Sequence, residues 1–132
     1  PDQTDIFYIN NKKRYTMKKT LLLATLVATT VTFAPVTTAA DNISLRICEY
    51  VAANDKNRLR SYLKQNKLKV RKIFKTVECN GKNLLVFSAS NKALETGEFL
   101  IGKVPSKEVA KHITEIGKYS KHLEEEAKDR VN

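Results

Sequence analysis

The chain has 132 residues, of which 42% are hydrophobic and 29% charged, and it has no tryptophan. This length and composition indicate one small domain. The formal net charge of +10 favours polyanionic or acidic partners. Part of this charge lies in segments that we expect to be missing from the mature protein.

Residues 1–16 are polar and start without methionine, and a much better initiator follows at Met17. We therefore expect this segment to be upstream reading frame that is translated in error. We predict no structure and no function for it.

Residues 17–40 have the pattern of a secretory signal peptide. Two lysines follow the methionine, an uncharged stretch comes next, and the segment ends in small residues. We predict cleavage after Ala40, which makes Asp41 the first mature residue. The alternative is a membrane anchor, since the segment is long enough to span a bilayer. Its seven threonines and Pro35 weaken the apolar stretch and favour cleavage.

The predicted mature protein, residues 41–132, carries 19 Lys and Arg against 12 Asp and Glu, a net charge of +7. A core of this size is marginal, so a covalent cross-link would matter. Cys48 and Cys79 both lie in this part, and an exported chain reaches an oxidising compartment. We predict a disulfide between them, which stabilises the fold by roughly 3.5 kcal/mol through loop closure. The alternative, a redox or metal pair, lacks the Cys-x-x-Cys spacing and a nearby histidine.

Two helical hairpins are predicted from apolar spacing and capping residues. The first joins residues 45–53, capped by Asn42 or Ser44, to residues 56–65, capped by Asp55. The second joins residues 84–91, capped by Asn83, to residues 94–103.

The connector between the hairpins has mixed signals. Apolar residues in 64–78 fall at helical spacing, which predicts a short helix, while their β-branched side chains leave a strand as the alternative. Asn80-Gly81 tolerates positive φ and predicts a turn.

The two hairpins resemble each other at an offset of 37 residues. This alignment pairs Asn54 with Asn91 and Tyr62-Leu63 with Phe99-Leu100. An asparagine then lies at each turn, and each second helix carries an aromatic residue followed by leucine. We interpret the pattern as a structural duplication.

The second hairpin resembles an ankyrin repeat in the positions of Gly81, Leu85, Ala89, Leu100 and Ile101. It departs from that family at residues 83–86, which replace threonine-proline-leucine-histidine. Lys92 stands where the turn glycine belongs, and Gly97 replaces an apolar residue. The resemblance implies stacked helical hairpins and no partner.

A longer resemblance covers residues 47–104. It rests on Cys48-Glu49-Tyr50-Val51-Ala52-Ala53-Asn54-Asp55, Arg58-Leu59-Arg60 and Cys79-Asn80-Gly81-Lys82-Asn83-Leu84-Leu85. These stretches are similar to a family of small exported proteins of unknown function from marine gammaproteobacteria. The resemblance implies a periplasmic or secreted domain with the cysteine pair as its framework, and it implies no activity.

After Pro105 we predict one long polar helix, capped by Ser106 and ending near Arg130. Its apolar residues alternate at spacings of four and three, which makes a narrow seam. Because Gly117 interrupts the helix and the seam is short, we expect it to pack on the domain or to fray rather than to form an independent coiled coil.

Candidate catalytic and metal-binding residues are sparse. Fragments of metal sites are His112 with Glu115, and His122 with Glu125 and Glu126. No third ligand is evident, so we interpret these residues as solvated helical ion pairs. No serine lies in a Gly-x-Ser-x-Gly elbow, and no phosphate-binding Gly-x-x-x-x-Gly-Lys loop is present. The sequence therefore predicts no enzyme, no metal and no cofactor.

The strongest surface signal is the basic stretch, residues 56–75, which has nine cationic residues and no acidic one. Such a stretch suits an anionic partner. The alternative is a solvated face that the acidic C-terminal helix offsets. Export argues against nucleic acid, so envelope phosphates, lipid headgroups or an acidic protein fit better. The candidate binding residues are Lys56, Arg58, Arg60, Lys64, Lys69, Arg71, Lys72 and Lys75.

The sequence thus predicts a mainly α protein. Residues 41–105 form two stacked helical hairpins with a basic connector, residues 106–132 form a C-terminal helix, and a signal-peptide helix comes before both. The expected role is non-catalytic binding of an acidic protein or envelope anion, in the periplasm or outside the cell. We expect the protein to contact the membrane only through its transient signal peptide. The alternative role is a structural or stress-associated periplasmic protein without a specific ligand.

Overall fold

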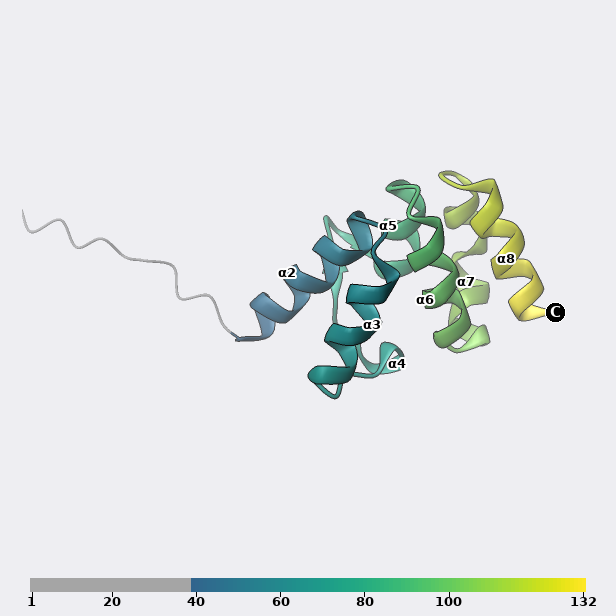
Figure 1. The fold of residues 1–132 in the computed structure, drawn as a ribbon. Helices are drawn as coiled ribbons and strands as arrows, with labels where there is room; N and C mark the ends of the chain where they lie inside the picture. Colours follow the sequence, from purple (N-terminus) through teal and green to yellow (C-terminus); the bar gives the residue numbers. More distant parts are fainter. Residues whose placement is uncertain (1–38) are drawn as a thin grey trace, which may run out of the picture. The chain divides into compact units, whose positions relative to one another are not determined.

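The computed structural model of the protein describes residues 39–132, so residues 1–16 and nearly all of the predicted signal peptide lie outside the described residues. The described part is mainly helical, which confirms the predicted fold class (Figure 1). Its elements are α2 (Ala39–Ala52), α3 (Lys56–Gln65), α4 (Val70–Ile73), β1 (Glu78–Cys79), β2 (Lys82–Asn83), α5 (Leu84–Ser90), α6 (Leu94–Lys103), α7 (Ser106–Gly117) and α8 (Lys121–Val131).

Helix α5 is the centre of the core. Every residue from Leu84 to Ala89 is buried, so this helix is enclosed on all sides. It contacts α2, α6 and α7 (Figure 1). The side chain of Asn83 caps it by accepting a hydrogen bond from the backbone N–H of Val86 at 3.0 Å, as predicted.

The first hairpin, α2 and α3, follows the prediction with one correction. Asp55 caps α3, and the bounds of α3 are the predicted ones. Helix α2 starts earlier than residue 45, however, so Asn42 and Ser44 lie inside it rather than at its cap. The early start has a local reason: alanine is the best helix former, and Asp41 lies in the first turn, where the helix dipole favours negative charge.

The connector between the hairpins contains both of the predicted alternatives. The helical part shrinks to the single turn of α4, and the chain then enters a two-residue strand, β1. Strand β1 pairs antiparallel with β2 through Cys79 and Lys82. The turn at Asn80-Gly81 has positive φ at both residues, 52° and 71°, which suits a two-residue β-hairpin.

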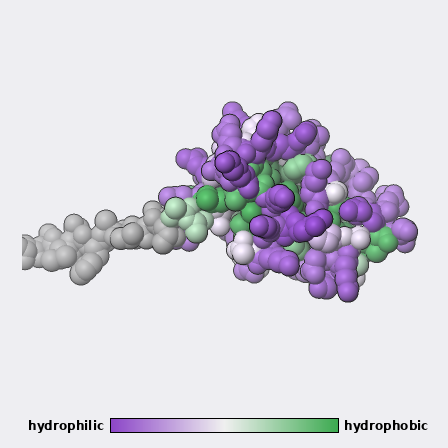
Figure 2. Space-filling view, turned by 90° about the horizontal axis from the view of Figure 1, so that it is seen from below, coloured by the Kyte–Doolittle hydropathy of each residue, from purple (hydrophilic) through white to green (hydrophobic). Residues whose placement is uncertain are grey.

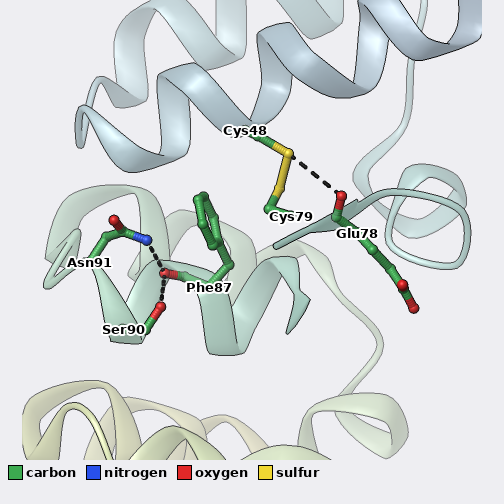
Figure 3. Close-up of a disulfide and its surroundings, with 6 residues drawn as sticks. All are labelled: Cys48, Glu78, Cys79, Phe87, Ser90 and Asn91. Atoms are coloured by element: carbon green, nitrogen blue, oxygen red, sulfur yellow. Dashed lines mark hydrogen bonds between the residues drawn. A yellow bond between two sulfur atoms is a disulfide. The ribbon is translucent and has the colours of Figure 1, made fainter. Parts of the chain in front are cut away.

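The predicted disulfide is confirmed. Cys48 of α2 and Cys79 of β1 are bonded, with Cα atoms 5.7 Å apart, so the cross-link ties the first hairpin to the connector (Figure 3). In the same view the ring of Phe87 extends from α5 toward α2, to one side of this bond. The carbonyl oxygen of Glu78 lies 3.8 Å from Sγ of Cys48. This is a contact without a donated proton, because a disulfide sulfur carries none.

The C-terminal segment corrects the prediction of one long helix. Helix α7 ends at Gly117, and Ser120 caps a separate helix, α8, through the backbone N–H of Leu123. Ser106 is the first residue of α7 and makes no capping hydrogen bond. The two helices form a third hairpin, which packs on α5 and α6. The expectation that this segment packs on the domain is therefore confirmed.

Gly97 permits the contact between the second and third hairpins. A Cβ atom at this position would lie 2.5 Å from Cδ1 of Leu123, a fully buried residue of α8. This close approach gives a physical reason for the small residue that departs from the ankyrin pattern.

The hairpins are equivalent in structure at an offset of 38 residues, not 37. In the first turn Asn54 has φ 53°, and in the second Lys92 has φ 52°. Each lies in a Schellman motif: the next residue, Asp55 or Ala93, donates its backbone N–H to a carbonyl five residues earlier. The predicted pairing of Asn54 with Asn91 is therefore one residue out of register. The left-handed residues mark the equivalent positions of the two turns, and they pair Asn54 with Lys92.

Asn54 also caps a helix in the other hairpin. Its Oδ1 accepts a hydrogen bond from the backbone N–H of Thr96, in the first turn of α6, at 3.1 Å. The residue at the N-cap position of α6 is Ala93, which has no side-chain acceptor. Thr96 is fully buried, so Asn54 satisfies a donor that water does not reach.

We expect Asn54→Gly to destabilise the protein by about 1–3 kcal/mol, because glycine keeps the left-handed backbone but leaves the buried N–H of Thr96 without its acceptor. Lys92→Gly is the matched control. It relieves the same backbone strain and removes no cap, so it should stabilise the protein by up to about 1 kcal/mol. Urea denaturation of the two variants measures both changes, and similar shifts in stability would contradict the capping role.

Candidate functional site

The main surface feature is a groove between α3, α4 and the C-terminal half of α6. Its volume is about 880 Å³, and its lining includes six cationic side chains and no carboxylate. Figure 2 views the molecule from below relative to Figure 1, and hydrophilic residues surround a smaller hydrophobic area on that face. The cationic lining residues are Arg60, Lys64, Lys69, Arg71, Lys72 and Lys103. We call this feature the cationic groove.

Helix α3 supplies one wall. Asn57, Arg60, Ser61 and Lys64 recur at intervals of three and four, so they share one face of the helix. The opposite face of α3 is anchored in the core through the fully buried Leu59. The cations of this wall therefore stand on a helix whose orientation is fixed by core packing.

A tight turn after α3 supplies the second wall. Lys67 has φ 53°, and Leu68 donates its backbone N–H to the carbonyl of Leu63, which closes a Schellman motif. The chain then reverses into Lys69 and the single turn of α4, whose Val70 is buried. This reversal places Arg71 and Lys72 on the same groove as the cations of α3.

Phe99 of α6 forms the apolar part of the lining together with Leu63, Leu68 and Val70. Leu63 and Val70 are nearly buried, at 4% and 7% exposure, whereas Leu68 and Phe99 are only partly buried. The guanidinium carbon of Arg60 lies 6.0 Å from the centre of the Phe99 ring, at the outer limit of a cation–π contact. A charged and an apolar group are therefore neighbours in the groove.

The structure divides the predicted binding residues into two sets. Arg60, Lys64, Lys69, Arg71 and Lys72 line the groove. The other three are associated with carboxylates elsewhere. Lys56 lies 4.0 Å from Glu95, Arg58 lies 3.3 Å from Asp55, and Lys75 helps to lower the pKa of Glu108.

Two lining residues escaped the sequence prediction. Phe99 and Lys103 lie 27 and 31 residues after Lys72, the last of the other lining residues, and are one helical turn apart on α6. The spacing of four residues places them on one face, but only the contact of α6 with α3 and α4 shows which face meets the groove.

Two acidic residues of the C-terminal hairpin are paired with lysines of the same hairpin. Glu108 accepts a hydrogen bond from Lys111, and Glu124 accepts from both Lys128 and Lys121. These hydrogen bonds hold the pKa of each carboxyl below its ordinary value. These two carboxylates are therefore paired mainly within α7 and α8, and no carboxylate is among the groove's lining residues.

The two histidines have different surroundings. His112 is partly buried, lies 3.2 Å from the amide nitrogen of Asn83, and stacks edge-on against Phe74, so it links α7 to the centre of the domain. Its predicted partner Glu115 lies 3.9 Å away. His112 thus combines a helical pair with tertiary contacts that sequence spacing did not predict.

His122 contacts a residue that the sequence did not associate with it. Its Nε2 lies 2.6 Å from Oε1 of Glu98, so α8 and α6 are bridged. Glu126 completes a group in which one ligand atom from each residue lies within 4.8 Å of the others. Imidazole and carboxylate ligate divalent cations, so within residues 39–132 this group could hold one. All three residues are exposed, and the ion pair alone accounts for the arrangement.

The fold and the groove define a small disulfide-linked helical domain with a cationic surface. A family model described as "Protein of unknown function (DUF3718)" matches residues 47–121, more than half of the chain, and the chain therefore belongs to this family. The predicted membership of an uncharacterised family is confirmed. A search of the curated proteins and a search of the solved structures each returned no match. The marine gammaproteobacterial origin and the ankyrin likeness stay predictions.

We expect the pKa of His122 to lie above its ordinary value of 6.5, chiefly because of the hydrogen bond to Glu98. The ion pair then contributes stability that is fully present below pH 6.5 and is lost as the pH rises through the raised pKa. Glu98→Gln should return the midpoint of the His122 imidazole resonance toward 6.5 in an NMR titration and should flatten this pH dependence. An unchanged midpoint would show that the bridge does not form in solution.

Proposed function

We propose that this protein is a non-catalytic binding module whose cationic groove holds an anionic partner. The observation that carries the proposal is the groove's lining of six cations without a carboxylate. Like charges that face one surface repel one another, and an anion relieves this repulsion. Three separate segments, α3, the turn with α4, and α6, bring these charges together although other cations of the chain lie beside carboxylates.

We propose further that the protein acts in an oxidising compartment, the periplasm or the cell exterior. The Cys48–Cys79 disulfide supports this location, because such bonds persist where thiols are not kept reduced. Cleavage after Ala40 would leave Asp41 in the first turn of α2, where its charge favours the helix. Non-reducing mass spectrometry of the native protein should find Asp41 at the N-terminus and no free thiol. A retained leader or a free Cys48 would contradict the proposal.

Charge reversal in the groove tests the binding role. Arg71→Glu with Lys72→Glu should weaken binding of inorganic polyphosphate, measured by calorimetry at low salt, by at least about tenfold, because two attractions become repulsions. The matched control is Lys118→Glu with Arg130→Glu, which changes net charge equally at exposed positions outside the groove. The control should change the affinity less than about twofold.

Two outcomes would contradict the binding role. Equal losses in both double variants would mean that net charge, and not the groove, governs binding. Absence of measurable binding in the unaltered protein would favour the alternative of a structural protein without a specific ligand.

A further inference from the structure

The cationic groove also has an apolar side, which a purely ionic partner would not use. Phe99 and Leu68 are partly buried hydrophobic residues that pack against the core and line the groove among the cations. The adjacent apolar residues, Leu63 and Val70, leave little surface exposed. The accessible apolar surface is therefore small, and charged groups stand on both sides of it.

The cations and the small apolar surface together determine which kind of ligand fits the groove. The cations are distributed over α3, the turn with α4, and α6, so they match several separate negative charges rather than one compact anion. The apolar surface of Phe99 and Leu68 suits one bulky side chain, whereas an acyl chain needs a long enclosed apolar cavity. The groove is partly open to solvent rather than enclosed, so a peptide segment can enter it from the surface.

We propose that the groove takes an acidic peptide segment of a partner protein, with one bulky apolar side chain that packs on Phe99 and Leu68. The inference rests on the anion-binding function proposed above and specifies its partner class. Carboxylates of the segment pair with Arg60, Lys64, Arg71 and Lys72 along the two walls. The contact between Arg60 and Phe99 lets one carboxylate and the apolar side chain bind next to each other.

The test compares two synthetic peptides that alternate glutamate and glycine and differ only in a central residue, phenylalanine or serine. The phenylalanine peptide should bind the unaltered protein about tenfold more tightly, because it buries an additional aromatic side chain. Phe99→Ala should reduce this difference to less than about twofold. Tyr119→Ala, which removes an exposed aromatic residue outside the groove, should preserve the difference.

A second variant guards against a loss of folding. Phe99 packs partly on the core, so Leu68→Asn, which lies outside the helices between α3 and α4, provides an independent test. It should reduce the preference for the phenylalanine peptide by severalfold, while circular dichroism reports an unchanged helix content.

The outcomes separate this inference from the proposed function. Equal affinity for the two peptides, together with polyphosphate binding that Arg71→Glu with Lys72→Glu removes, would overturn the apolar anchor and leave the anion-binding function standing. Failure of every anion to bind would overturn both. Binding to phosphatidylglycerol vesicles that Phe99→Ala weakens, with no preference between the peptides, would overturn the peptide in favour of a lipid.

Discussion

The arrangement of the hairpins depends on the side chain of Asn54. The residue terminates α2 in a left-handed conformation and caps α6 through the backbone N–H of Thr96. Its neighbour Asp55 caps α3, so one turn fixes the starts of two helices that belong to different hairpins. Because α3 and α6 provide facing parts of the cationic groove, the separation of the groove's walls follows from this shared cap and from the core beneath it. The Cys48–Cys79 bond fixes the same hairpin to the connector on another side.

The fold gives different surroundings to cations that look equivalent in the sequence. All nine cations of the basic stretch fall in 20 residues, yet ion pairs, a turn and a short helix distribute them over different surroundings. The turn that reverses the chain toward Arg71 and Lys72 carries backbone strain. Its residue Lys67 occupies a left-handed position that glycine would adopt more easily. In the third hairpin, Glu108 and Glu124 accept hydrogen bonds from lysines of their own helices, and neither lines the groove.

Much of the fold could be predicted because its signals are local. Asp55 and Asn83 cap the helices that follow them, Asn80-Gly81 forms the turn, and the two cysteines pair. The predictions were incomplete or wrong where contacts between residues far apart in the sequence determine the structure. Asn54 was placed in a turn correctly, but its role as a cap for α6 needs a contact across 42 residues. The sequence does not reveal the break between α7 and α8, because the spacings of four and three continue through it and Ser120 itself falls on the seam. Phe99 and Lys103 could not be predicted as lining residues, because they lie outside the basic stretch in sequence. Tertiary packing alone brings α6 beside that stretch.

If residues from α3, α4 and α6 act together as one binding surface, ¹H–¹⁵N correlation spectra recorded during titration with the glutamate–phenylalanine peptide should show it. Shift changes should concentrate on Arg60, Lys64, Arg71 and Lys72 and extend to Phe99 and Lys103, while Lys56 and Lys75 change little. Changes that cover the whole basic stretch evenly and leave Phe99 and Lys103 unaffected would contradict it, because sequence charge and not the assembled groove would then define the surface.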